Sequence, residues 1–171
     1  MVKLVRLISR KQSRGFTLIE LMTVIAVASV LMVLAAPSFS NLVKSQRLRT
    51  AASELYGDMT FARSEALNRR ATVSITPLDS AAEGSKDWAK GWKIVLGTAA
   101  AGTTILKTRE AFEGNISAPS GTSVEFGIAG RPTATTVSKA TFKHSDLPEA
   151  SWRCVQIEPS GRPTNKEGKC P

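Results

Sequence analysis

Histidine, cysteine and tyrosine are scarce in this 171-residue chain, which has one histidine, His144, two cysteines, Cys154 and Cys170, and one tyrosine. No cysteine or carboxylate pair stands at a recognisable spacing from the histidine to make a catalytic or metal-binding group with it. A glycine-rich phosphate-binding loop is also absent. We therefore expect no catalytic residue, no metal site and no cofactor, and we do not expect an enzyme.

One long apolar run, from Gly15 to Ala36, dominates the N-terminal part of the chain. Its 21 residues from Phe16 onward are close to the about 20 that a helix needs to cross a bilayer. A secretory signal has a shorter apolar core and a small-residue cleavage site behind it. Here a basic segment ends next to Gly15, so a cut between Gly15 and Phe16 would remove the charges and keep the helix.

A single acid, Glu20, interrupts the apolar run. A charged side chain in a membrane helix costs about 2.5–3.5 kcal/mol on insertion scales and is retained mostly for function. After a cut at Gly15, the nearest cation would be the new amino group of Phe16, about one helical turn away. We expect the Glu20 carboxylate to pair with such a group, in its own chain or in a neighbouring one.

The run Gly15-Phe16-Thr17-Leu18-Ile19-Glu20 resembles the class III signal of type IV pilins and type II secretion pseudopilins. The resemblance implies that a prepilin peptidase cuts after Gly15 and that the new N-terminus of Phe16 is methylated. It also implies that Glu20 pairs with the terminus of an adjacent subunit during assembly. The alternative is an ordinary signal anchor that carries a stray acid.

The charge distribution predicts the topology of the chain. The formal charge is +9, but five of the 23 basic residues and none of the 14 acidic ones lie before Gly15, which leaves +4 for the processed chain. Basic residues before a membrane helix favour a cytoplasmic N-terminus, so the C-terminal part would cross the inner membrane. Cys154 and Cys170 would then lie in an oxidising compartment, and we expect them to pair.

Beyond Ala36 the helical pattern becomes amphipathic. Pro37 removes one backbone hydrogen bond and crowds the preceding turn, so it should kink or loosen the helix near the membrane surface. Apolar residues then recur every three or four positions and predict one buried stripe on a helix that continues to about Asn68. The stripe consists of Leu48, Ala52, Leu55, Met59, Ala62 and Ala66.

The pattern after the helix is typical of strands. β-branched residues alternate from Ala71 to Thr76, and a polar stretch from Leu78 to Lys90 reads as a loop. A hairpin is expected around the alanine-rich turn from Gly97 to Gly102. The expected strands are 71–76, 92–96, 104–108, 123–126, 135–143 and 152–158. Strands after one long helix indicate an α+β domain whose antiparallel sheet packs on the apolar stripe.

Short motifs narrow the resemblance to one group of pilins. The runs AASEL at 51–55, ARSEA at 62–66 and DWAKGW at 87–92 resemble the minor pilins of the FimT/FimU type and the related H-type minor pseudopilins. The resemblance implies a pilin-like α+β fold with four parts. These are a cleaved leader at 1–15, a transmembrane and filament-core helix at 16–36, an amphipathic continuation at 37–70 and a β-rich domain at 71–171.

The same resemblance implies a function and a location. The chain would be a minor type IV pilin that prepilin peptidase processes and that joins other major and minor pilins, at the tip or in an initiation complex. It would start as a single-pass inner-membrane protein with a periplasmic domain and end in a surface pilus. The alternative is an H-type minor pseudopilin of a type II secretion system, because both machines share this design.

A tetrapeptide occurs twice in the C-terminal half, as Gly130-Arg131-Pro132-Thr133 and Gly161-Arg162-Pro163-Thr164. Each copy follows a predicted strand, and turn chemistry alone can explain it. The functional alternative is that the arginines stand exposed on loop tips. Some FimT-type pilins bind DNA through a C-terminal Gly-Arg-x-Arg motif in natural transformation, and Thr164 replaces the second arginine here.

DNA contact requires several cations that can reach successive phosphates. The candidates for contact with double-stranded DNA are Arg162, Lys166, Lys169, Arg153 and Arg131. A Cys154–Cys170 bridge would close a loop that contains three of them and would stabilise the domain by about 3 kcal/mol. Such a bridge serves equally as a structural staple at the end of the domain.

Overall fold

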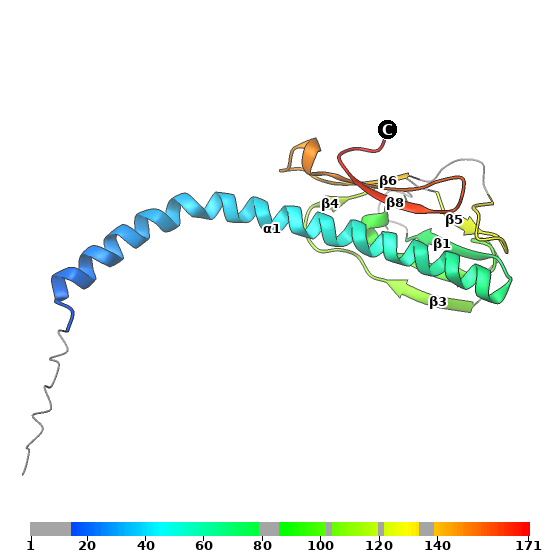
Figure 1. Ribbon diagram of the computed structural model, residues 1–171, viewed down its shortest axis with the longest axis horizontal. Helices are drawn as coiled ribbons and strands as arrows, with labels where there is room; N and C mark the ends of the chain where they lie inside the picture. The colour runs from blue at the N-terminus through cyan, green and yellow to red at the C-terminus, as the bar shows by residue number, and fades with distance from the viewer. Residues whose placement is uncertain (1–14, 79–85, 102–103, 120–121, 134–138) are drawn as a thin grey trace, which may run out of the picture. The chain divides into compact units, whose positions relative to one another are not determined.

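The computed structural model describes residues 15–78, 86–101, 104–119, 122–133 and 139–171, without the side chains of 34–37. The chain divides into two compact units, Met1–Phe39 and Ser40–Pro171. Helix α1, Leu18–Arg69, runs through both (Figure 1). Most of the predicted leader lies outside the described residues.

In the first unit, the apolar run forms the N-terminal part of α1, and its large side chains are exposed. Phe16 is 82% exposed, and the large apolar side chains from Leu18 to Val33 are exposed in the same way. Within the described residues, no single helix meets the length and hydropathy criteria for a membrane span, whereas Leu18–Val33 and Ser38–Arg69 meet them together as a bent pair. Pro37 lies within α1, but its side chain is outside the described part, so its kink stays a prediction.

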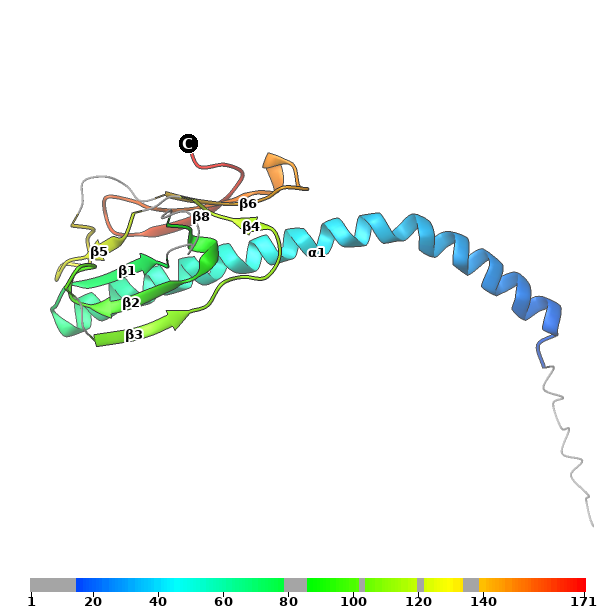
Figure 2. The same ribbon diagram turned by 180° about the vertical axis from the view of Figure 1, so that it is seen from behind.

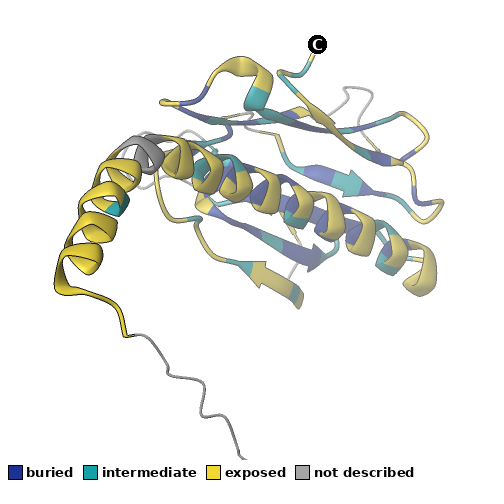
Figure 3. Ribbon diagram, turned by 60° about the vertical axis from the view of Figure 1, so that its left-hand side comes forward, coloured by how far each residue is buried: buried dark blue, intermediate teal, exposed yellow. Residues whose placement is uncertain are grey.

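In the second unit, α1 forms one side of the core. All six residues of the predicted stripe are buried, together with Ala51, on the side of α1 that faces the strands (Figure 3). The helix ends one residue after the predicted end. The amide of Ala71 donates to the carbonyl oxygen of Ala66 at 3.3 Å, and Arg70 takes a positive φ of 48°. This is the Schellman arrangement, in which glycine is the usual residue at the position of Arg70.

The strands form two antiparallel sheets. The first has the order β3-β2-β1-β5, and β3 lies at its edge (Figure 2). The second has the order β4-β6-β7-β8. The strands of the first sheet are β1 Val73–Pro77, β2 Trp92–Leu96, β3 Thr104–Arg109 and β5 Val124–Phe126, and those of the second are β4 Ile116–Ser117, β6 Lys139–His144, β7 Arg153–Ile157 and β8 Pro163–Glu167.

The predicted hairpin is confirmed, because β2 and β3 pair antiparallel around residues 97–103. The prediction missed two strands and assumed a single sheet. β4 has only two residues, and β8 begins with a proline, which edge strands tolerate because one side of them needs no hydrogen bonds. Two short 3-10 helices, η1 Trp88–Lys90 and η2 Glu149–Ser151, complete the described elements. Residues 135–138 of the predicted strand 135–143 lie outside the described part.

The motif DWAKGW holds β2 and β4 to the core. Asp87 Oδ1 accepts hydrogen bonds from the amides of Ala89 at 2.8 Å and Ala118 at 2.7 Å. Gly91 has a φ of +96°, and a Cβ there would stand 2.2 Å from the carbonyl oxygen of Arg109. The tryptophans of the motif, at positions 88 and 92, are fully buried. The motif is therefore structural.

Candidate functional site

The N-terminal site begins with a helix cap. The amide of Glu20 donates to Thr17 Oγ1 at 3.3 Å, and the amide of Leu21 donates to the carbonyl oxygen of Thr17 at 3.2 Å. Thr17 and Glu20 have the Thr-x-x-Glu spacing of a capping box, which the sequence alone could have indicated. The Glu20 carboxylate thus lies in the first turn, where the positive end of the helix dipole favours it.

The residues on either side of the expected cut are accessible. Nothing lies within 4 Å of a Cβ built on Gly15, and Phe16 is exposed. Glu20 is exposed too and forms no ion pair with any residue the structure describes. An exposed carboxylate on an otherwise apolar stretch of helix can pair with a cation of a neighbouring molecule. Cleavage and methylation themselves stay predictions.

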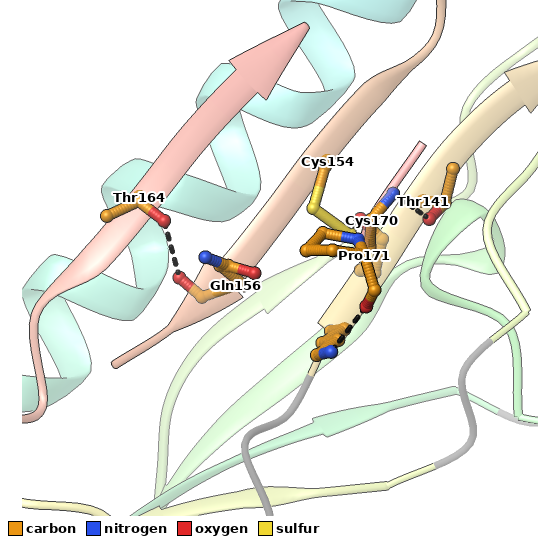
Figure 4. Close-up of a disulfide and its surroundings, with 8 residues drawn as sticks. Thr141, Cys154, Gln156, Thr164, Cys170 and Pro171 are labelled. Carbon is orange, nitrogen blue, oxygen red and sulfur yellow. Dashed lines mark hydrogen bonds between the residues drawn. A yellow bond between two sulfur atoms is a disulfide. The ribbon is translucent and has the colours of Figure 1, made fainter. Parts of the chain in front are cut away.

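The predicted disulfide between Cys154 and Cys170 is present (Figure 4). Cys154 lies on β7, and the tail that carries Cys170 reaches across to β6. There the amide of Cys170 donates to Thr141 Oγ1 at 3.3 Å, and the Lys139 ammonium donates to the carbonyl oxygen of Pro171. The bridge therefore fixes the end of the chain across the second sheet. The loop that it closes is the β7–β8 hairpin rather than an irregular loop.

The two tetrapeptides adopt the same turn. In the first, the amide of Gly127 donates to the carbonyl oxygen of Arg131 at 2.9 Å and that of Gly130 to the carbonyl oxygen of Gly127 at 2.8 Å. The second repeats both bonds 31 residues later, from Glu158 to Arg162 at 2.9 Å and from Gly161 to Glu158 at 2.8 Å. Both closing glycines have a positive φ, 66° at Gly130 and 82° at Gly161.

The two turns also touch each other. A Cβ built on Gly161 would stand 2.1 Å from the carbonyl oxygen of Gly130 and 3.2 Å from the Cα of Arg131. Helix α1 fixes the pair, because Arg63 donates from Nε to the carbonyl oxygen of Gly130 at 3.0 Å and from Nη2 to that of Ser160 at 3.3 Å. We call residues 127–131 and 158–162 the paired turns. They lie at the same end of the domain as the C-terminal end of α1 (Figures 1 and 2).

The five DNA candidates separate into three environments. Arg131 and Arg162 are exposed on turns whose backbones touch, and neither has an ion-pair partner among the described residues. Arg153 is mostly buried, and its Nη2 pairs with Glu167 Oε1 at 2.6 Å. Lys166 pairs with Cys154 in the sheet register, at the far end of the hairpin from Arg162. Lys169 follows Lys166 in the tail. The sequence grouped these residues by proximity along the chain, but the hairpin separates them.

The flank of α1 that faces β3 carries further charges. Asp58, with a side chain 5% exposed, accepts from Trp92 Nε1 at 2.8 Å and pairs with the Lys107 ammonium. Glu54 Oε2 lies 3.4 Å from Arg109 Nη1, without hydrogen-bond geometry. A pocket of about 530 Å³ opens beside them. Its lining consists of Thr50, Glu54, Thr108, Arg109, Glu110, Ala111, Phe112 and Glu113.

The single histidine takes part in a small network with Asp146 and with Lys44 of α1. The amide of Asp146 donates to His144 Nδ1 at 3.1 Å, and Asp146 Oδ2 lies 2.7 Å from Lys44 Nζ on α1. The hydrogen bond from Lys44, with a second from Ser145, lowers the pKa of the Asp146 carboxyl below its ordinary value. The described residues contain no group of three or more histidine, cysteine, aspartate or glutamate side chains that could hold a metal ion.

Two family models match this chain. The family described as type II transport protein GspH matches residues 51–161, and the prokaryotic N-terminal methylation motif matches residues 10–36. No curated protein matches the sequence.

Two crystal structures of the type IV minor pilin FimU from Pseudomonas aeruginosa strain PAO1 are similar to this chain. The form in space group P21 is 26% identical and has a TM-score of 0.60, with 73% of this chain and 92% of that chain covered. The form in space group P65 is 27% identical and has a TM-score of 0.58, with 70% and 92% covered.

Proposed function

The chain belongs to the GspH family of type II transport proteins, and from this premise we propose that it is a minor type IV pilin, processed by a prepilin peptidase and assembled into a pilus. One combination of features carries the proposal. A methylation motif heads an exposed apolar helix, and that helix continues into a domain similar to the minor pilin FimU. An exposed apolar helix of this length requires cover by lipid before assembly and by other subunits afterwards.

Glu20 would direct the assembly step. Peptidase cleavage after Gly15 would expose an ammonium group on Phe16, and the Glu20 carboxylate of a neighbouring subunit would pair with it. At 4 Å, two unit charges attract by about 1 kcal/mol in water and by about 4 kcal/mol at an effective dielectric of 20. In lipid, such a pair would bring an incoming helix into register with its neighbours.

The proposed location follows from the basic residues that precede the apolar run and from the four predicted parts of the chain. Residues 1–15 would be removed, 16–36 would span the inner membrane and later fill the filament core, 37–70 would continue the helix, and 71–171 would lie in the periplasm. The partners would be prepilin peptidase and other major and minor pilins, with a place at the tip or in an initiation complex.

The alternative within the same class is an H-type minor pseudopilin of a type II secretion system. It is favoured by the family description, which names a type II transport protein, whereas the similarity to FimU favours the pilus. Deletion of the gene distinguishes the two. Loss of surface pili with normal protein secretion supports the pilin, and the reverse result supports the pseudopilin.

A second candidate function is contact with double-stranded DNA. The observation in its favour is that Arg131 and Arg162 are exposed on two sequence-distant turns whose backbones touch. Each phosphate that such a cation neutralises releases counterions and adds affinity. A gel-shift titration of the processed protein in detergent tests it. Binding that weakens with salt and with Arg162→Ala supports DNA contact, whereas no binding at low salt contradicts it.

Two variants test the main proposal in the native host. Gly15→Ala should block cleavage, so that the full leader is retained. Glu20→Val should allow cleavage but reduce the amount of the protein recovered in sheared surface filaments, and Thr23→Val serves as a control on the same helix. Normal cleavage of the Gly15 variant, or normal incorporation of the Glu20 variant, contradicts the proposal.

A further inference from the structure

One asparagine of the β-rich domain stands in a glycosylation sequon. The chain has four asparagines, at positions 41, 68, 115 and 165, and only Asn115 has a serine or threonine two positions later, in the run Glu113-Gly114-Asn115-Ile116-Ser117. The pattern Asn-x-Ser/Thr, in which x is not proline, is the acceptor for N-linked glycosylation in exported proteins. Glu113 completes the longer pattern, with an acidic residue two positions before the asparagine, that bacterial oligosaccharyltransferases recognise.

The structure holds this run at both ends. The amide of Phe112 donates to the carbonyl oxygen of Ala89 at 3.0 Å, and the amide of Ala118 donates to Asp87 Oδ1 at 2.7 Å. Between these two anchors the chain bends over residues 113–115 and then forms β4. The sequon is therefore a short surface segment that the DWAKGW motif fastens to the domain.

The two residues that define the sequon lie on the outward side of this segment. Successive side chains of a strand point to opposite faces. Ile116 and Ala118 are buried in the core, whereas Asn115 is exposed and Ser117 is half-buried. Asn115 and Ser117 are therefore on the same, solvent-facing side of the segment.

The Asn115 side chain takes no part in holding the bend. An asparagine in a turn commonly bonds to nearby backbone groups through its side chain. Here neither the Asn115 amide group nor the Ser117 hydroxyl group forms a hydrogen bond with any residue that the structure describes. Both groups are thus available to an enzyme, and a large substituent on Asn115 would extend into solvent.

We propose that Asn115 is N-glycosylated by a membrane oligosaccharyltransferase. The proposal rests on the proposed function, because export brings the domain to the side of the membrane on which such enzymes act. In the reaction, Asn115 Nδ2 attacks the anomeric carbon of an oligosaccharide that is carried on a polyprenyl pyrophosphate. A carbon–nitrogen bond forms, the bond from that carbon to the pyrophosphate oxygen breaks with its electron pair, and the released pyrophosphate takes up the proton that Nδ2 loses.

The burial of Ile116 limits when the reaction takes place. Ile116 is 8% exposed and pairs with His144 in the register of β4 and β6. The transferase must therefore receive the segment before β4 joins β6, or during a local opening of this two-residue strand. In the folded domain the glycan stays in solvent. This side of the domain would then face outward in a pilus, because a bulky hydrated oligosaccharide does not pack between subunits.

Mass spectrometry of the protein from its native host tests the proposal. The peptide that contains Asn115 should carry the added mass of whole sugar residues, and fragmentation should locate that mass on the Asn115 side chain. Asn115→Gln and Ser117→Ala should each abolish the addition, whereas Ser117→Thr preserves the sequon and should retain it. The matched control is Asn165→Gln, which removes an exposed asparagine outside the sequon and should leave the glycan in place.

Glu113→Gln tests the longer pattern. The change removes the carboxylate but keeps the length of the side chain and the Asn-x-Ser run. It should lower the ratio of glycosylated to bare chain by about tenfold, the loss expected when one hydrogen bond to a charged group is removed from the enzyme complex. An unchanged ratio would overturn the role of Glu113.

The N-terminal peptide in the same digest separates failure of this proposal from failure of the pilin function. A sugar mass that persists in Asn115→Gln would overturn the proposal. A bare Asn115 in a chain that begins at Phe16 would overturn glycosylation and leave the pilin function standing. A bare Asn115 in a chain that keeps its leader would count against both.

Discussion

Gly161 lies so close to Gly130 that a Cβ on Gly161 would stand 2.1 Å from the carbonyl oxygen of Gly130. The contact joins the two turns that lead into the Gly-Arg-Pro-Thr runs, 31 residues apart, and it places Gly161, the residue before Arg162, against the backbone of Arg131. The second sheet is thus held to the end of the first sheet and of α1 by backbone contacts that tolerate no side chain. The glycines of the repeat are required for packing as well as for turn geometry.

Gly161→Ala should therefore destabilise the domain more than an ordinary glycine replacement. The positive φ costs about 1 kcal/mol for a non-glycine residue, and the displacement of the neighbouring turn adds about 1–3 kcal/mol. Gly168→Ala is the matched control, because Gly168 has a φ of +88° but nothing within 4 Å. Urea unfolding in detergent should show a clearly larger loss for Gly161→Ala, and equal losses would contradict the contact.

Arg63→Leu should loosen the paired turns. It removes the donors to the carbonyl oxygens of Gly130 and Ser160, which should lower the free energy of unfolding by about 1–3 kcal/mol. Amide hydrogen exchange should rise in residues 127–131 and 158–162. Arg49→Leu removes only an exposed ion pair with Glu167 at 3.7 Å and should cost less than about 1 kcal/mol. Unchanged exchange in both turns would refute the role of Arg63.

Asp58→Leu should be among the more destabilising single changes on α1. It leaves Trp92 Nε1 without its acceptor in the core and Lys107 without its carboxylate, at a cost of about 2–4 kcal/mol. Asp58→Asn keeps an acceptor for the indole and should recover part of the loss. Unfolding followed by tryptophan fluorescence measures both variants. Equal stability of the two would show that the hydrogen bond to Trp92 contributes nothing.

The Lys44–Asp146 contact should make the free energy of unfolding depend on pH. Because Lys44 lowers the pKa of the Asp146 carboxyl, the folded state binds the proton less readily than the unfolded one. The stabilisation is therefore present above the ordinary pKa of 3.8 and is lost as the pH falls through the lower, folded value. Unfolding curves at pH 6 and at acid pH should show that Asp146→Asn loses less stability on acidification than the wild type does. Identical pH profiles would contradict the assignment.

Removal of the disulfide should weaken the second sheet. Cys154 and Cys170 are 16 residues apart, and a loop of this length contributes about 3 kcal/mol by the chain-entropy estimate. Replacement of both cysteines by serine should lower the unfolding midpoint and free the tail from β6. Cys170→Ser alone adds an unpaired thiol at Cys154 and should be no more stable than the double variant. A double variant with wild-type stability would show that the hydrogen bonds of the tail suffice.

The sequence predicted the fold well where a regular pattern spans many residues. The apolar stripe from Leu48 to Ala66 and the β2–β3 hairpin depend on local periodicity and turn residues, so both were found. β8 was missed because the segment Pro163–Glu167 is polar and begins with proline, and only its pairing with β7 makes it a strand. Hydrogen bonds of this kind leave no local pattern in the sequence.

The site could be predicted only in part, for the same reason. The repeat of Gly-Arg-Pro-Thr was visible, but the contact between its two copies depends on Arg63 and on the packing of two sheets. Local charge counting placed Arg153 with the DNA candidates, whereas its partner Glu167 lies on a strand that the sequence did not indicate. Contacts between distant segments therefore set which cations remain free.

The N-terminus of the protein isolated from its native host tests the central claim most directly. Mass spectrometry of the N-terminal peptide should find a chain that begins with Phe16 and carries a methyl group on its amino nitrogen. A mature protein that still contains residues 1–15 would contradict the account.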